Sequence, residues 1–198
     1  MGVFSFVIIS SVQAQDENGF FRPYASIGLS SSQISGDQLS GFDQLGLVTG
    51  LGVEVGRSED WVPSFELLFI QKGSRKNARP DEGDFNSYLL RMNYVELPLL
   101  MNYTTSSTGF HLGLAPAYLI SLREENQNGE ILGLGREFDS FDLSLLLGIQ
   151  YAFAQRWELA TRFNQSIIPV REHAGNSTFR WNRGQYNSSI QFMLRFHV

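Results

Sequence analysis

Large apolar side chains alternate with small or polar ones along most of this chain. In residues 141–153, every second residue from Phe141 to Phe153 is large and apolar, and the residues between include Asp142, Ser144 and Gln150. Side chains on a β-strand point alternately to two faces, so such a run gives a strand with one apolar and one polar face. When many strands do this and the polar face carries charges, the apolar face meets lipid and the polar face lines a barrel.

Eight stretches carry this period of two. We expect strands at residues 22–30, 46–56, 61–73, 87–104, 108–122, 138–153, 156–166 and 184–198. The predicted fold is all-β, an eight-stranded antiparallel up-and-down transmembrane β-barrel with a closed lumen. No internal repeat or linker interrupts the pattern, which predicts a single barrel domain over residues 15–198.

The connections between these strands alternate in length. The short ones are 57–60, 104–107 and 154–155, and the long polar ones are 31–45, 74–86, 123–137 and 167–183. Outer-membrane barrels have short periplasmic turns and long extracellular loops. The alternation therefore predicts an integral protein of the cell outer membrane, surrounded by its lipid, with both termini in the periplasm.

Aromatic residues gather at the ends of the expected strands. Those beside the short turns are Trp61, Tyr103, Phe110, Phe153 and Trp157, and those beside the long loops are Tyr88, Phe138, Phe141 and Tyr186. Two aromatic belts are typical of the two membrane interfaces. The alternative is a soluble β-sandwich with an aromatic core, in which these residues would not sort to strand ends.

Composition narrows the class further. The 198 residues carry a formal net charge of −5, which gives no basic surface for nucleic acid, and the absence of cysteine excludes disulfides and thiolate metal sites.

Residues 1–14 resemble an export signal, with an apolar stretch over 3–12 and small residues before a cleavage site after Ala14. No Lys or Arg precedes that stretch, and the alternative reading is a buried apolar strand.

The polar faces of the expected strands carry charges of both signs. We expect a lumen salt-bridge network of Glu54, Glu66, Glu96, Glu158, Arg162 and Arg195. A soluble lipocalin-like barrel would have an apolar lumen, where such charges could not remain unpaired. We therefore predict one connected network, with Arg162 and Arg195 as hubs, that blocks the barrel.

A proline interrupts the fourth expected strand. Pro98 has no backbone N–H to donate to a neighbouring strand, so we expect a β-bulge at this position.

One segment carries a family resemblance. Residues 94–103 read YVELPLLMNY and resemble the Y-x-E-x-P-L-L-x-x-Y strand of the PorT-like outer-membrane β-barrel family of Bacteroidetes. The stretch 28–30, followed by Gly36-Asp37 and by LSGF at 39–42, resembles that family's first strand and loop. The resemblance implies a small outer-membrane barrel. One namesake is tied to type IX secretion and gliding, and because this chain is shorter, that role is not carried over.

Chemistry-bearing residues are few. The three histidines, His111, His173 and His197, fall on different elements, which predicts neither a metal site nor a catalytic set, and no cofactor or small-molecule substrate is indicated. The loop residues able to contact a partner are Arg79, Asp81, Arg123, Glu124, Arg171 and Arg180. Three functions stay open: a non-enzymatic scaffold or accessory subunit of an outer-membrane complex with a protein partner, a free-standing structural or adhesive barrel, and a small lipid-modifying enzyme.

Overall fold

The computed structural model describes residues 20–36, 41–56, 61–130, 137–172 and 184–198. The predicted signal peptide, residues 1–14, and the loop residue Arg180 lie outside the described residues. No helix in the described ranges is both long and apolar enough to span a membrane.

Antiparallel strands make up nearly all of the described chain. They are β1 (Phe21–Ser35), β2 (Gln44–Val55), β3 (Trp61–Lys76), β4 (Tyr88–Glu96), β5 (Leu99–Thr105), β6 (Thr108–Asn126), β7 (Gly129–Glu130), β8 (Phe141–Ala154), β9 (Trp157–Ser166), β10 (Arg171–Glu172) and β11 (Gly184–His197). A single 3₁₀ turn, η1 (Pro80–Glu82), lies between β3 and β4 in the described part of the chain.

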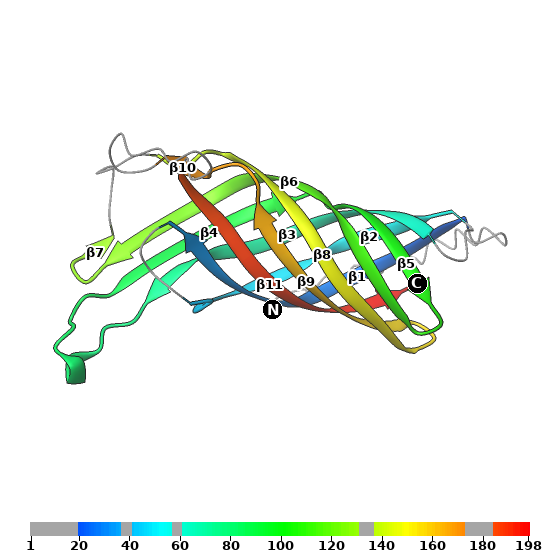
Figure 1. Cartoon of the computed structure of the whole chain (residues 1–198), viewed down its shortest axis with the longest axis horizontal. Coiled ribbons are helices and arrows are strands. Elements are labelled where there is room, and N and C mark those ends of the chain that lie inside the picture. Colours follow the sequence, from blue (N-terminus) through cyan, green and yellow to red (C-terminus); the bar gives the residue numbers. More distant parts are fainter. Residues whose placement is uncertain (1–19, 37–40, 57–60, 131–136, 173–183) are drawn as a thin grey trace, which may run out of the picture.

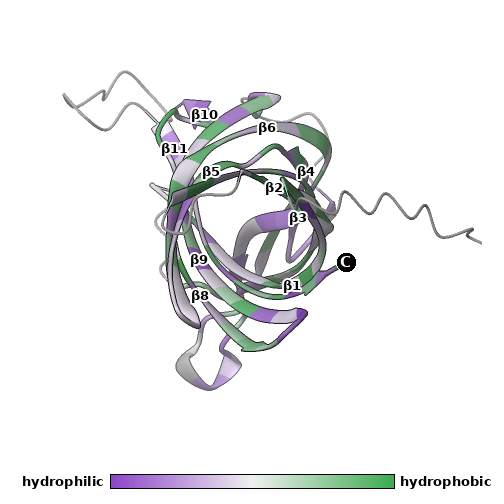
Figure 2. Cartoon of the chain, turned by 90° about the vertical axis from the view of Figure 1, so that its right-hand side faces the viewer, coloured by the Kyte–Doolittle hydropathy of each residue, from purple (hydrophilic) through white to green (hydrophobic). Residues whose placement is uncertain are grey.

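The long strands form a closed ring, as the alternation predicts. Each long strand pairs with its sequence neighbour in the order β1-β2-β3-β4-β6-β8-β9-β11, and β1 pairs with β11 from Tyr24↔His197 to Ser35↔Tyr186. β5 continues β4, because both pair with β3 and β6. The result is an eight-stranded antiparallel barrel, seen from the side in Figure 1 and from one end in Figure 2.

Several strands are longer than their hydrophobic pattern predicts. β1 continues to Ser35, so much of the expected loop 31–45 is strand. β3 continues to Lys76, and β6 continues to Asn126 before turning back into β7. Polar residues in these extensions hide the period of two, but their backbone groups still pair across the ladder. The extensions project beyond the ring at the end opposite the chain's C-terminus (Figure 1).

The outer face of the ring is apolar and carries an aromatic belt at one end. Trp61, Tyr103 and Phe110 occupy one level because they are successive cross-strand partners, and the rings of Trp61 and Tyr103 are 4.9 Å apart. Phe153 and Trp157, beside the β8–β9 turn, are also exposed to the outside. These five residues lie near the short turns, where the interface of a membrane would select them.

We call the end of the barrel where β1, β3 and β6 project beyond the ring the hairpin end. The aromatic belt predicted there is only partly observed. Phe141 is 50% exposed on the outer face, and the unpredicted Tyr118 beside it is 60% exposed. Tyr88 and Phe138 instead pack against the apolar interior cluster, and the Tyr88 hydroxyl donates to Glu124 Oε1 at 2.7 Å. The expectation for these two was wrong because both fall on the inward phase, an even number of residues from the buried Leu90 and Asp142.

Pro98 does not produce the expected bulge. Glu96 pairs with Ala117 and Leu99 with Leu114, so the register is the same on both sides of the proline. The carbonyl oxygen of Pro98 accepts a hydrogen bond from the backbone amide of Glu66 at 3.0 Å, which keeps the ladder to β3 intact. The register shifts elsewhere, at Asn93/Tyr94, where β6 contains one extra residue, Ile120. The bulge therefore lies on the neighbouring strand, nearer the hairpin end.

Glycine makes room for large side chains in the narrow lumen. Gly52 lies opposite Tyr24, and a Cβ built at Gly52 would come within 2.3 Å of the tyrosine ring. We predict that Gly52→Ala lowers the free energy of unfolding by about 1–3 kcal/mol, as overpacking of a filled interior does. Guanidinium unfolding of the chain in lipid vesicles, followed by tryptophan fluorescence, measures this.

The matched background is Tyr24→Leu, which removes the ring that the new methyl group would meet. The cost of Gly52→Ala should be smaller in that background than in the natural chain, because the two effects are coupled through one contact. An equal cost in both backgrounds would show that the glycine serves the backbone and not the tyrosine ring.

Candidate functional site in the barrel lumen

Glu66 on β3 binds two arginines from the far side of the lumen. Arg162 Nη1 and Nη2 donate to its two carboxylate oxygens at 2.9 and 3.0 Å, and Arg195 Nη2 donates to Oε1 at 2.9 Å. Arg195 Nη1 also donates to Glu158 Oε1 at 2.8 Å, and the Tyr24 hydroxyl donates to Glu66 at 2.6 Å. The two arginines balance the two carboxylates, so this group, which we call the lower group because it lies nearer the short turns, has no net formal charge. Among its donors, Arg195 Nε is buried without a hydrogen-bond partner in the described part of the chain.

His111 completes the lower group. Arg162 Nε donates to His111 Nε2 at 3.2 Å, so Nε2 carries no proton, and Nδ1 then donates to Gln150 Oε1 at 3.1 Å. Gly148, the partner of His111 across the β6–β8 ladder, gives the imidazole its space, because a Cβ there would come within 2.3 Å of Nε2. The histidine therefore acts as an acceptor that orients Arg162.

A second charged group lies nearer the hairpin end. Lys72 Nζ is 2.8 Å from Glu96 Oε2 and 3.7 Å from Asp142 Oδ2, and all three side chains are fully buried. Asn164 donates to both oxygens of Glu96 at 3.2 and 3.1 Å, and Asn187 donates to Asp142 at 3.1 Å. With one lysine and two carboxylates, this upper group carries one more negative than positive charge.

Both groups join opposite sides of the barrel. β9, which carries Arg162 and Asn164, is four steps from β3 in either direction around the ring. Bonds from β9 to Glu66 and Lys72 on β3 therefore cross the full diameter. Leu68 lies between Glu66 and Lys72 on the inner face of β3, and it belongs to a buried apolar cluster that separates the groups.

The structure divides the expected single salt-bridge network into the lower group, the upper group and a separate ion pair. Glu96 binds Lys72 and Asn164 and not the arginines. Glu54 pairs with Arg22 at 3.0 Å near the mouth. The expectation was wrong because charges on one inner face can lie at different heights. Lys72 and Asp142 were missing from the predicted set, although both fall on the inward phase and their alternation could have found them.

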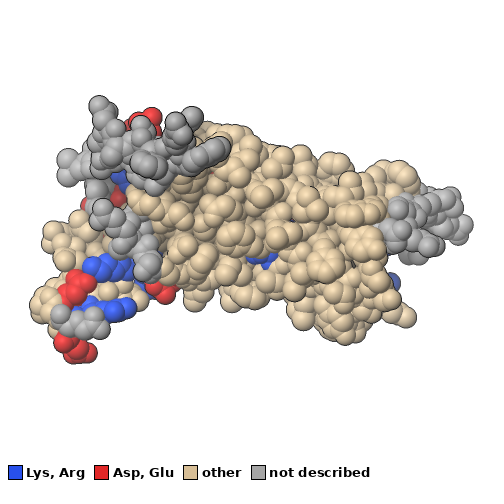
Figure 3. All heavy atoms as spheres, in the orientation of Figure 1, with Lys and Arg blue, Asp and Glu red and all other residues tan. Residues whose placement is uncertain are grey.

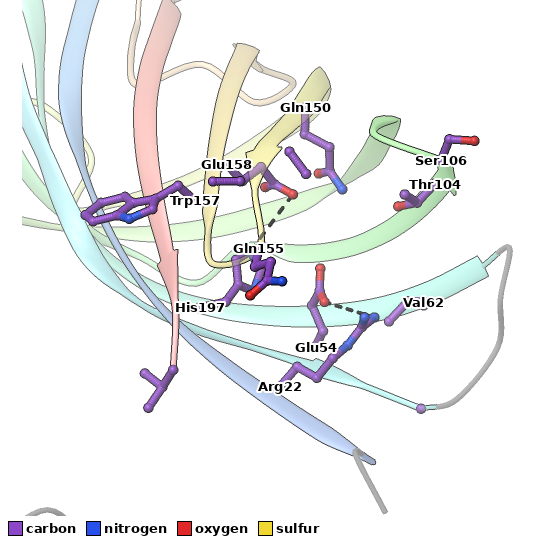
Figure 4. A pocket seen from close by; sticks show the side chains of 14 residues that line it. Arg22, Glu54, Val62, Thr104, Ser106, Gln150, Gln155, Trp157, Glu158 and His197 are labelled. Atoms are coloured by element: carbon purple, nitrogen blue, oxygen red, sulfur yellow. Dashed lines mark ion pairs between the residues drawn. The ribbon is translucent and has the colours of Figure 1, made fainter.

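A pocket of about 590 Å³ opens at the end of the barrel that holds the short turns (Figure 4). Arg22 and Glu54 line one side, and Glu158 lies 4.0 Å from His197 Nε2. The lower charged group forms its floor, because Glu158 and Gln150 belong to both. The pocket is a polar vestibule that ends at the charge-filled section of the lumen.

The predicted partner-contact residues are spread over the hairpin end. Arg79 and Asp81 lie at the tip of the β3–β4 connection, and Arg123 is on the outer face of β6, beside Glu125. Glu124 and Arg171 face inward at the rim, where Arg171 Nη1 is 3.4 Å from Glu124 Oε1. At the tip, the hydrogen bond from Lys76 holds the pKa of Asp84 below its ordinary value.

The closed antiparallel ring, the apolar outer face and the charge-filled lumen define a transmembrane β-barrel. The chain matches the family model of the outer membrane protein beta-barrel domain over residues 9–172, so it belongs to that family. It is an outer-membrane β-barrel protein. No curated protein matches the chain in sequence.

Solved structures of small barrels resemble this one. Neisserial surface protein A, NspA, aligns with a TM-score of 0.52 and 15% identity, covering 88% of this chain and 96% of that chain. Ail, the attachment invasion locus protein of Yersinia pestis, in complex with the heparin analogue sucrose octasulfate, aligns with a TM-score of 0.49 and 10% identity, over 90% of this chain and 99% of that one. The likeness to NspA is one of fold.

We predict that Arg162→Leu lowers the free energy of unfolding by about 3–5 kcal/mol, because it leaves the buried Glu66 carboxylate with half of its cationic partners. Chemical unfolding in lipid vesicles measures this. Arg156→Gln, at an exposed turn residue, is the control and should change stability by less than about 0.5 kcal/mol. Equal stability of both variants would mean that the lower group contributes nothing. Planar-bilayer recordings of Arg162→Leu should show no large conductance, because the upper group still crosses the lumen.

Proposed function

We propose that this protein is a non-enzymatic scaffold or accessory subunit of a larger outer-membrane complex for secretion, assembly or transport. It is oriented with both termini in the periplasm, and it contacts its protein partner through the hairpins at the opposite end. The resemblance of residues 94–103 to the PorT-like barrels of Bacteroidetes supports a small outer-membrane barrel as the starting point of this proposal, without the role of any one member of that family.

The observation that carries this proposal is the filled lumen. Arg162 and Lys72 are fully buried and hold bonds across the diameter at two heights. An eight-stranded barrel is only just wide enough for its own side chains. Side chains joined in this way leave a solute no path along the axis without breaking buried ion pairs, which favours a role exercised through the outer surfaces.

The chemistry of the described histidines also favours a non-enzymatic role. His111 is held by Arg162 and Gln150, and His197 faces Glu158 and the ring of Tyr24. Acyl transfer by a serine needs a histidine within hydrogen-bond reach of the hydroxyl. The partners of both described histidines are instead charged, amide or aromatic side chains.

The hairpins supply the surface for a partner. β3, β4 and β6 extend beyond the rest of the ring (Figure 1), and charged side chains gather there while the middle of the molecule shows almost none (Figure 3). The β3–β4 hairpin is ordered at its tip by Lys76 and Asp84, whose charged atoms are 2.7 Å apart. A hairpin stiffened in this way can dock with little loss of conformational entropy.

Cysteine labelling tests the orientation, and the chain has no cysteine of its own. We predict that single cysteines at Asn77 and Asn128, both exposed on the hairpins, react with an impermeant maleimide in intact cells. A cysteine at Ser107, in the β5–β6 turn, should react only after the outer membrane is permeabilised. The reverse pattern would invert the topology.

Purification from native membranes in mild detergent tests the complex. We predict that the tagged chain co-migrates with a stable protein partner, and that deletion of the hairpin tip 78–85 abolishes this association while the barrel still folds. Recovery of the chain as a lone species, no larger than its own 22.3 kDa, would instead support the free-standing structural or adhesive barrel.

A further inference from the structure

Three arginines lie together on the outer face of adjacent strands. Arg91 on β4 and Arg123 on β6 are direct cross-strand partners, and Arg75 on β3 is the diagonal neighbour of Arg91, whose own partner is Gly73. All three are exposed. Like charges directly opposite each other in a sheet destabilise it unless something compensates. We call Arg75, Arg91 and Arg123 the arginine patch.

The bulge at Ile120 creates this patch. Without the extra residue, the strict alternation along β6 would turn Arg123 toward the lumen, beside the inward Met92 and Leu90. With it, Ser121 and Arg123 share the outer face with Asn93 and Arg91, and Asn93 Nδ2 donates to Ser121 Oγ at 2.6 Å. Bulges commonly re-aim a side chain in this way.

The charge of the patch is only partly neutralised by its neighbours. Glu125 pairs with Arg123, and Asn77 accepts from Arg75 Nε at 2.8 Å. Arg91 has no ion pair among the described residues. Glu130 on β7 is the cross-strand partner of Glu125 and lies on the same face. The outer face therefore presents three guanidinium groups against two carboxylates, an excess of one positive charge where the sheet leaves its apolar band.

The height of the patch matches a lipid headgroup. Arg91 is 12 residues along the strand path from Tyr103 in the aromatic belt. At about 3.3 Å per residue and a tilt of ~40°, this is a rise of ~30 Å, just above an apolar band of ~25 Å. Moving outward along these strands, Val95 and Tyr118 are followed by Asn93 and Ser121, and then by the arginines. Apolar, then amide and hydroxyl, then cationic groups follow the order of acyl chain, glycerol or sugar, and phosphate in a lipid.

We propose that the arginine patch binds the phosphorylated headgroup of a lipid in the leaflet at the hairpin end. Guanidinium groups bind phosphate through paired, charge-assisted hydrogen bonds. The acyl chains of that lipid lie against the apolar wall of β3, β4 and β6 below the patch. The proposal rests on the orientation proposed above only for which leaflet supplies the lipid, because the contacts are the same in either orientation.

The test is lipid binding by the full chain folded in detergent micelles, measured by native mass spectrometry. The probes are bisphosphorylated lipid A and lipid A with both phosphates removed. We expect the first to bind and the second to bind at least tenfold more weakly. Arg91→Gln and Arg123→Gln should each weaken binding about fivefold, and the double variant about 25-fold, from the contribution of one cationic side chain at a membrane surface.

Arg156→Gln removes an exposed arginine at the opposite end of the barrel and should leave binding unchanged. Equal binding of the two lipids, or an equal loss in Arg156→Gln, would overturn the proposal. Displacement of lipid A by millimolar inorganic phosphate would also overturn it, because the site would then be a simple anion site. None of these outcomes depends on orientation or on a protein partner, so failure here is distinct from failure of the proposed function.

Discussion

Closure of the sheet is the constraint on which the rest of this structure depends. In hydrocarbon, an unpaired backbone N–H or C=O costs several kcal/mol, so the first and last strands must pair with each other along their whole length. β1 and β11 do so from Tyr24↔His197 to Ser35↔Tyr186. Once the ring is closed at eight strands, its width is fixed, and every inward side chain must fit within that width.

The narrow width explains both the charges and the glycines of the lumen. Glu66 and Arg162 are long enough to meet across the diameter only because the ring is small. Tyr24 and His111 fit beside them because Gly52 and Gly148 have no side chains. Buried ion pairs give little net stability compared with apolar packing, but they specify which strands face each other. In this barrel they align β3 with β9 at two heights.

Strand phase could be predicted from the sequence, whereas height and local irregularity could not. A period of two assigns Glu66 and Arg162 to the same side of the wall, and the structure brings them together. The period of two gives no information on the stagger between strands. For this reason Glu96 and Glu54 were assigned to the network of Arg162 and Arg195, whereas they pair with Lys72 and Arg22 at other heights. The bulge at Ile120 follows from no turn residue or proline, so the outward position of Arg123 was not predictable. The sequence pattern placed the ends of β1, β3 and β6 several residues too early. Hairpins that project beyond the membrane need no apolar face, so the alternation that marks a strand stops before the strand does.

The bonds across the lumen also bear on the order of assembly. Glu66 and Arg162 are 96 residues apart in the chain, and Lys72 and Asn164 are 92 apart. Contacts of such long sequence separation form late, because the intervening chain must first be organised. Until β9 arrives, Glu66 lacks Arg162 and Lys72 lacks Asn164, so water must hydrate those sides of the two charges. Expulsion of water from the interior is therefore coupled to the arrival of the last strands, so a barrel stalled before β9 would keep a wet, half-open wall.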